Sequence, residues 1–138
     1  MAIQQKIIIS VIVSSNKLKV WAYYTQPEHI TKWNFADPSW HCPQASNEMR
    51  VGGRYFARME AKDQLNGFDF EAFYTEIKQG ENFTYEFDER LAKVEFNEVN
   101  GKTKVTITFD PETENPIELQ RNGWQAILDN FKKYTEMN

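Results

Sequence analysis

Apolar and polar residues alternate with a period of two through most of the chain after Glu48. In the segment 54–62 one face carries Tyr55, Met59 and two alanines, and the other face is mostly charged. Such alternation is typical of an antiparallel strand with one buried face. The pattern recurs downstream, where Asn100-Gly101 is a strong signal for a two-residue hairpin turn. The predicted strands cover residues 54–62, 68–78, 83–87, 91–99 and 102–109.

The first part of the chain predicts one strand followed by two short helices. Residues 3–13 are rich in Ile and Val, which favours a strand. A helix is expected over residues 16–24, with the hydroxyls of Ser14-Ser15 as its N-cap. A second helix is expected over residues 27–33, because Pro27 suits the first helical position. Residues 34–47 contain two prolines and are expected to form an aromatic-rich loop.

A long amphipathic helix is predicted at the C-terminal end. Asn115-Pro116 followed by Glu118 is typical of a helix start, and the helix should run to about Glu136. Its apolar stripe has helical spacing and consists of Gly123, Trp124, Ile127, Leu128, Phe131 and Tyr134. The order of elements predicts an α+β helix-grip fold. In this fold a curved antiparallel sheet of six or seven strands wraps the long C-terminal helix, and two short helices follow the first strand.

Three segments carry a resemblance to a known family: KVWAYYTQPE at 19–28, MRVGGRYF at 49–56, and Asn122-Gly123-Trp124. In this order and at these distances they resemble the bacterial homologues of the activator of heat-shock-protein-90 ATPase. These belong to the START-like superfamily, also called birch-pollen-allergen-like or SRPBCC. The resemblance extends from about Lys6 to Tyr134 and implies one START-like domain over residues 1–138. It implies a fold more than a function, because this fold hosts many unrelated activities.

Composition narrows the classes of function. The net charge is −4, the pI is about 5.2 and no run of Lys or Arg occurs, which argues against nucleic-acid binding. Cys42 is the only cysteine, so an internal disulfide is excluded and a reducing cytoplasm is the expected location. The apolar run Ile7-Ile8-Ile9 is too short to span a membrane, so no membrane insertion is expected. The chain is expected to be a monomer or a homodimer.

Residues suited to catalysis or metal binding are sparse. His29, His41 and Cys42 lack the short fixed spacing of a metal site. His41 and Cys42 are adjacent and would point apart on an extended chain, which disfavours a nucleophile–base pair. We therefore expect no metal and no cofactor, and binding is favoured over enzymatic activity. The charged residues of 60–63, with Asp69 and Glu71, are expected on a solvated outer sheet face with cross-strand pairs. The alternative is that one carboxylate turns into a cavity and binds a polar ligand end.

Aromatic residues are the main functional lead, with ten Phe, six Tyr and four Trp. The resemblance implies a cavity between the long helix and the concave sheet face, and an apolar lining with a few polar tips suits a small molecule. The expected lining is Trp33, Trp40, Tyr55, Met59, Phe70, Tyr74, Phe83, Tyr85, Trp124 and Leu128. The alternative is that these side chains fill the core to normal density. The loop with Trp33, Phe35 and Trp40 is the expected lid, and Gly123 predicts a close approach of helix and sheet.

Three functions remain open from the sequence. The first is a protein that binds an apolar or amphipathic small molecule in this cavity. The second, implied by the family resemblance, is a co-chaperone-like module that binds a chaperone or another protein partner. The third is an enzyme of the cyclase, dehydratase or hydrolase type that acts in the same cavity.

Two local features of the predicted sheet can be checked directly. Either or both of Gly52 and Gly53 should have a positive φ or lie where a β-carbon would clash. Paired residue numbers of strands 54–62 and 68–78 must sum to an odd value, because only then do their apolar faces coincide. The preferred sum is 129, which sets Arg58 opposite Glu71, Phe56 opposite Phe73 and Tyr55 opposite Tyr74.

Overall fold

The described part of the chain is built on one curved antiparallel sheet of seven strands, in the order β1-β7-β6-β5-β4-β3-β2. The computed structural model describes residues 5–138. The strands are β1 (Ile7–Val13), β2 (Trp40–Asn47), β3 (Arg54–Ala61), β4 (Gly67–Lys78), β5 (Asn82–Phe87), β6 (Arg90–Val99) and β7 (Lys102–Phe109). The helices are α1 (Lys17–Thr25), α2 (Pro27–Trp33) and α3 (Ile117–Met137). The predicted α+β helix-grip fold is confirmed.

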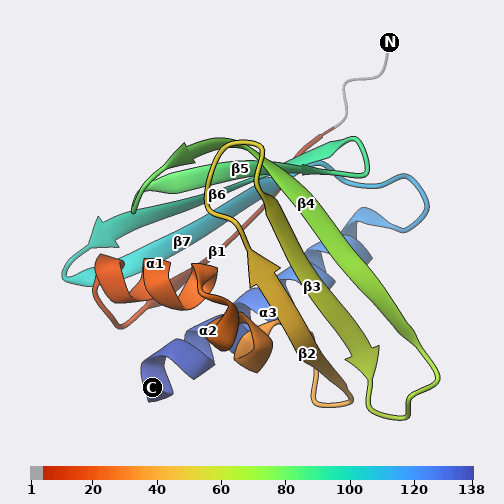
Figure 1. The fold of residues 1–138 in the computed structure, drawn as a ribbon. Helices are drawn as coiled ribbons and strands as arrows, with labels where there is room; N and C mark the ends of the chain where they lie inside the picture. The colour runs from red at the N-terminus through yellow and green to blue at the C-terminus, as the bar shows by residue number, and fades with distance from the viewer. Residues whose placement is uncertain (1–4) are drawn as a thin grey trace.

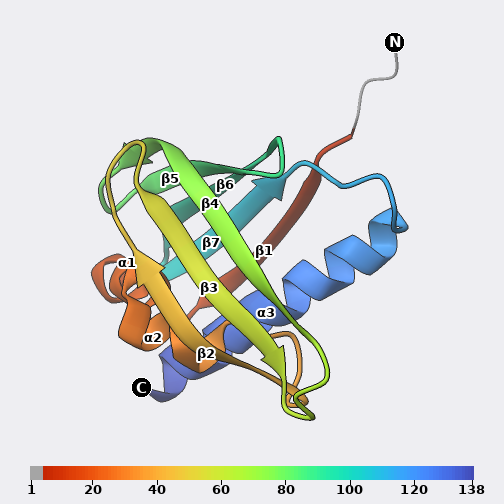
Figure 2. The same ribbon diagram turned by 45° about the vertical axis from the view of Figure 1, so that its right-hand side comes forward.

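Helix α3 crosses the concave side of the sheet, and Figures 1 and 2 show the strands curling around it. The helix packs chiefly against β1 and α2. Phe131 of α3 is fully buried, with its ring centroid 5.0 Å from those of Tyr24 and Trp33. The strands β3 to β5 form the other side of the grip, across from α3 (Figure 2).

Strand β2 was not predicted, and the expectation of a loop over residues 34–47 is wrong from Trp40 onward. The strand is polar and lies at the sheet edge, so it lacks the alternation that reveals a half-buried strand. Its pairing with β3 shifts between His41 and Gln44, and Pro43 lies inside that irregularity. Proline is tolerated at such an edge bulge, because no ladder hydrogen bond is needed there.

The starts of α1 and α3 differ from the prediction, whereas that of α2 agrees with it. Asn16, not Ser14 or Ser15, caps α1, and its side-chain oxygen accepts a hydrogen bond of 2.9 Å from the Lys19 backbone N–H. Pro27 begins α2 as predicted. Helix α3 begins one residue after Pro116. The predicted first strand began at Ile3, which lies outside the described residues; the described strand starts at Ile7.

The parity of the β3–β4 pairing is confirmed, but the preferred register is wrong by two residues. Tyr55 lies opposite Ala72 and Arg58 opposite Asp69, so paired numbers sum to 127. The connecting turn sets this register. The Asp63 carboxylate accepts a hydrogen bond of 2.8 Å from the Leu65 N–H, and Gln64 adopts a left-handed φ of 65°.

Both glycines before β3 are structural, as predicted. Gly52 has a φ of +83°, a region that glycine occupies without strain. Gly53 lies in a tight turn, where an added β-carbon would stand 2.1 Å from the carbonyl oxygen of Glu48 and 2.8 Å from that of Arg50. The pair therefore sets the entry of the chain into β3.

Gly53→Ala is expected to lower the free energy of unfolding by more than about 1 kcal/mol, because two backbone oxygens would have to move. Gly123→Ala is the matched control. It lies inside α3, nothing lies within 4 Å of an added β-carbon, and alanine should stabilise the helix by roughly 0.5–1 kcal/mol. Urea unfolding measures both variants, and equal effects would contradict the prediction.

Candidate functional site

A pocket of about 300 Å³ lies between α3 and the concave face of the sheet. Helix α3 contributes Trp124, Ile127 and Leu128; Tyr24 of α1, Trp33 of α2 and Asn34, which follows α2, line the other end. The strand residues that line it are Tyr55, Met59, Phe68, Asp69, Phe70, Tyr85, Phe87, Arg90 and Ile107, with Asp88 in the β5–β6 turn. Alternation along β3 and β5 accounts for this, because it turns Tyr55, Met59, Tyr85 and Phe87 to the concave side.

The pocket wall consists of aromatic rings that brace one another. The ring centroid of Phe70 lies 5.9 Å from those of Tyr55 and Tyr85, and 5.2 Å from that of Phe87. On the helix side the Trp124 ring stacks on Phe109 at 3.9 Å with an interplanar angle of 12°. Rings held by several neighbours keep their positions, so the wall is formed without a ligand.

Three tyrosine hydroxyls supply polar groups inside this apolar wall. The Tyr55 hydroxyl accepts a hydrogen bond of 3.2 Å from the side-chain amide of Asn34. The hydroxyls of Tyr24 and Tyr85 have no hydrogen-bond partner among residues 5–138. Burial raises the pKa of all three phenols well above 10.0, so each hydroxyl stays neutral and can both donate and accept.

Seven of the ten predicted lining residues border the pocket: Trp33, Tyr55, Met59, Phe70, Tyr85, Trp124 and Leu128. The structure places the other three elsewhere. Phe83 is fully buried beneath α1, with its ring centroid 5.9 Å from Trp21. The Tyr74 hydroxyl donates a hydrogen bond of 2.6 Å to the side-chain oxygen of Asn47. Trp40 begins β2 and packs against Phe68.

Two further expectations concerned the lid of the pocket and a close approach of helix and sheet at Gly123. Of the three residues expected in the lid, only Trp33 borders the pocket, and it is a buried helix residue. The close approach expected at Gly123 is wrong, because the space beside this residue is open.

Several lining residues were missed, and one carried a usable signal. Phe87 continues the alternation of Phe83 and Tyr85, so its phase placed it on the concave face. Asn34 and Arg90 carried no such signal. Their positions depend on where α2 ends and where the β5–β6 turn forms, which are tertiary features.

The charged residues on β3 and β4 form the expected cross-strand pairs on the outer face. Arg58 binds Asp69 at 3.2 Å and Arg54 binds Glu71 at 2.5 Å, both across the two strands, and Arg58 also binds Glu60 of its own strand at 3.0 Å. Asp69 also borders the pocket mouth. The mouth therefore combines an apolar interior with charges at its rim.

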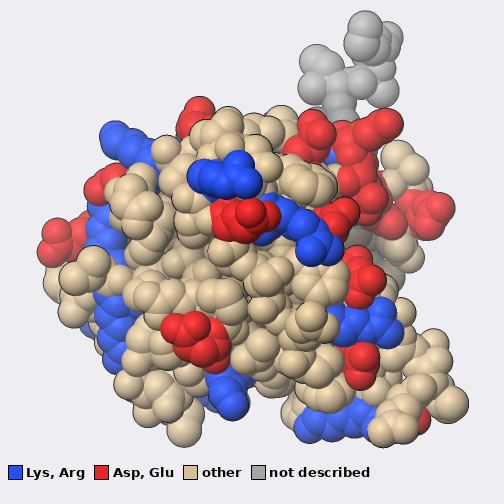
Figure 3. Space-filling model, viewed as in Figure 1, with Lys and Arg blue, Asp and Glu red and all other residues tan. Residues whose placement is uncertain are grey.

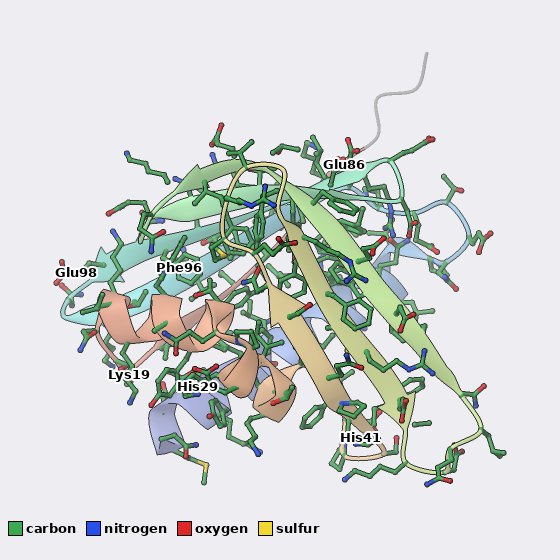
Figure 4. All side chains as sticks on the ribbon, in the orientation of Figure 1. Lys19, His29, His41, Glu86, Phe96 and Glu98 are labelled. Carbon is green, nitrogen blue, oxygen red and sulfur yellow. The ribbon has the colours of Figure 1, made fainter. Side chains whose placement is uncertain are left out.

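The two histidines and the cysteine do not form one cluster. His29 on α2 and His41 on β2 lie far apart (Figure 4). Cys42 is buried, and burial raises the pKa of its thiol to about 11, so it is a poor nucleophile at neutral pH. Among residues 5–138 no three His, Cys, Asp or Glu side chains are grouped to hold a metal ion. In the same part of the chain, no helix has the length and apolarity needed to cross a bilayer.

A family model described as "Activator of Hsp90 ATPase homolog 1-like protein" matches residues 16–136. The chain belongs to this family. The AHSA1-like protein from Aeromonas hydrophila is 36% identical, with a TM-score of 0.91 over 96% of this chain and 93% of that one. A protein of Cytophaga hutchinsonii is 42% identical, with a TM-score of 0.82 over the same shares of the two chains.

A protein of Nitrosomonas europaea shares the fold at 16% identity, with a TM-score of 0.83 over 99% of this chain and 97% of that one. No curated protein matches the chain. The resemblance found in the sequence is thus confirmed. Membership of the AHSA1-like family is consistent with a ligand-binding module or with a module like the Hsp90 ATPase activator.

Proposed function

We propose that this protein binds an apolar or amphipathic small molecule in the pocket between α3 and the sheet. The observation that carries the proposal is the pocket itself. Its wall is aromatic, and it includes two tyrosine hydroxyls without a partner among residues 5–138. Small-molecule sites are usually built in this way, with an apolar lining and a few polar groups that fix orientation.

The pocket differs from an ordinary well-packed core. Native cores contain few voids larger than a water molecule. The volume of about 300 Å³ falls at the lower end of the range for ligand pockets. The proposal therefore favours a compact ligand, such as a fused pair of rings, whose hydroxyl or carbonyl meets Tyr24 or Tyr85. An ionised group inside the aromatic part would lose its hydration without a paired charge, which is unfavourable.

Saturating 2-naphthol is expected to raise the melting temperature of the wild-type protein. A ligand that binds only the folded state stabilises that state by mass action, and at a hundredfold excess over Kd the stabilisation is about 2.7 kcal/mol. Ile127→Trp places a larger ring at the pocket and should abolish the shift. Ile12→Trp is the matched control, since Ile12 is 44% exposed on β1 and does not line the pocket. Equal shifts in all three proteins would place the binding elsewhere, and no shift in the wild type would contradict the proposal.

The second candidate is a co-chaperone-like interaction module. It is supported by the family description and by exposed apolar residues at the tip of the β3–β4 hairpin, where Leu65 is 82% and Phe68 is 51% exposed. Pull-down of the heat-shock-protein-90 homologue of the source organism tests it. Retention by the wild type but not by a Leu65→Ser, Phe68→Ser double variant would favour this function, and absence of retention would count against it.

A further inference from the structure

The pocket reaches the surface where β4 and β5 part. Their pairing ends at Phe73 opposite Glu86, so the part of β4 that carries Asp69 and Phe70 pairs only with β3. Asp69, Phe70, Phe87 and Asp88 border both the pocket and a groove on the outer face of the sheet. We call this shared edge the mouth of the pocket; the rings of Phe70 and Phe87 lie across it, with their centroids 5.2 Å apart.

The β5–β6 turn brings a cation to this mouth. Asp88 and Glu89 form a two-residue connection with left-handed φ values of 48° and 60°. Such a turn usually contains glycine or asparagine, because other residues rarely adopt a positive φ. The turn sets Arg90 directly opposite Phe87 in the β5–β6 pair.

The Arg90 guanidinium is held in place but keeps free donors. Its carbon lies 4.7 Å from the centroid of the Phe87 ring, and Nη1 donates a hydrogen bond of 3.3 Å to the backbone carbonyl of Asp110. Within residues 5–138 no carboxylate oxygen lies within 4.0 Å of it. A guanidinium has five N–H donors in a planar fork that fits a carboxylate, so most of them remain for a ligand.

The acidic residues of the mouth offer a weaker site for a cation. Asp69 is bound to Arg58 at 3.2 Å. Asp88 is exposed on the turn, where water competes for it. Arg90 is partly buried, so its interaction with an opposite charge is screened less.

The surroundings limit the charge of a ligand that Arg90 can take. Acidic side chains gather at the upper right of Figure 3, the side on which Figure 1 places the β5–β6 turn and the loop between β7 and α3. Glu86, Asp88 and Glu89 are all exposed there. A phosphate, which carries more negative charge than a carboxylate, meets more repulsion from them.

We infer that Arg90 binds the carboxylate of an amphipathic monocarboxylic acid, whose ring or short chain lies between the aromatic walls. The inference rests on the proposed function and specifies its ligand class. Arg90 supplies the paired charge that an ionised group needs at the edge of an apolar pocket. The apolar end of the bound ligand thus lies among the aromatic side chains, and its carboxylate lies at the edge of the pocket that Arg90 lines.

Calorimetric titration at pH 7 with three matched probes tests the inference: neutral 2-naphthol, anionic 2-naphthoate and cationic 2-naphthylmethylamine. In the wild type, 2-naphthoate is expected to bind roughly tenfold more tightly than 2-naphthol. Arg90→Gln should remove this difference. Arg90→Lys should keep part of it, because the charge remains and the planar fork is lost. Arg50→Gln removes an equal charge at an exposed arginine outside the pocket and should change nothing.

Three outcomes overturn the inference while the proposed function stands. The first is equal binding of naphthol and naphthoate by the wild type, and the second is a preference for naphthoate that survives in Arg90→Gln. The third is tightest binding of the amine, with loss in Asp88→Asn. If the wild type binds neither 2-naphthol nor 2-naphthoate, the proposed function and the inference are both overturned.

Discussion

Stability of this protein is expected to fall steeply above pH 10, because four buried tyrosine hydroxyls ionise only when the chain unfolds. Burial raises the pKa of Tyr24, Tyr55, Tyr74 and Tyr85 above the ordinary value of 10.0. Between the unfolded and folded pKa values the folded state therefore binds more protons than the unfolded state. The contribution of these tyrosines to stability is constant well below pH 10 and decreases above it by about 1.4 kcal/mol per pH unit for each tyrosine, or roughly 5 kcal/mol for four.

Urea unfolding between pH 8 and 11 measures this slope, with tyrosinate absorbance and tryptophan fluorescence as two probes. Tyr85→Phe is the sharpest comparison, because its hydroxyl has no hydrogen-bond partner among residues 5–138. The variant should match the wild type at pH 7 within about 0.5 kcal/mol and lose about a quarter of the slope. Because surface lysines titrate in both proteins, their contribution cancels. Appearance of tyrosinate near pH 10 from all four residues while fluorescence stays native would contradict the prediction.

The periodic part of the fold could be predicted from the sequence because burial of one face imposes it. Tyr55 and Met59 alternate with charged residues, which fixed both the strand and the parity of its pairing. Parity leaves registers two residues apart undecided, and the Asp63 hydrogen bond in the turn selects between them. Strand β2 escaped prediction because an edge strand with a polar sequence and Pro43 has no such face.

The pocket could be predicted only in part. The alternation along a strand shows which face of the sheet a side chain lies on, but not whether that side chain borders the pocket or is covered by a helix. Phe83, Tyr85 and Phe87 share one face of β5, yet Phe83 is covered by α1, whereas Tyr85 and Phe87 border the pocket. Arg90 lines the pocket because of where the β5–β6 turn forms. The ends of the pocket thus depend on where the helices cover the sheet and where β4 leaves β5, and neither is encoded in local alternation.

Trp124→Ala is expected to lower the free energy of unfolding by about 3 kcal/mol, the lower end of the range of roughly 3–5 kcal/mol for large buried aromatics. The sequence alone placed Trp124 on the apolar stripe of α3. In the structure one ring face stacks on Phe109 at 3.9 Å, and the Phe87 centroid lies 5.8 Å away. The side chain is only partly buried and borders the pocket, so fewer packing contacts are lost than in a closed core.

Thermal and urea unfolding of Trp124→Ala give this value. Leu119→Ala is the control on the same helix, because Leu119 is 59% exposed and its truncation should change stability by no more than about 0.5 kcal/mol. The tryptophan variant should also lose 2-naphthol binding, since it removes one wall of the pocket, whereas the leucine variant should keep it. An unchanged melting temperature for Trp124→Ala would mean that the stack on Phe109 does not form, and the helix side of the pocket would then be wrongly placed.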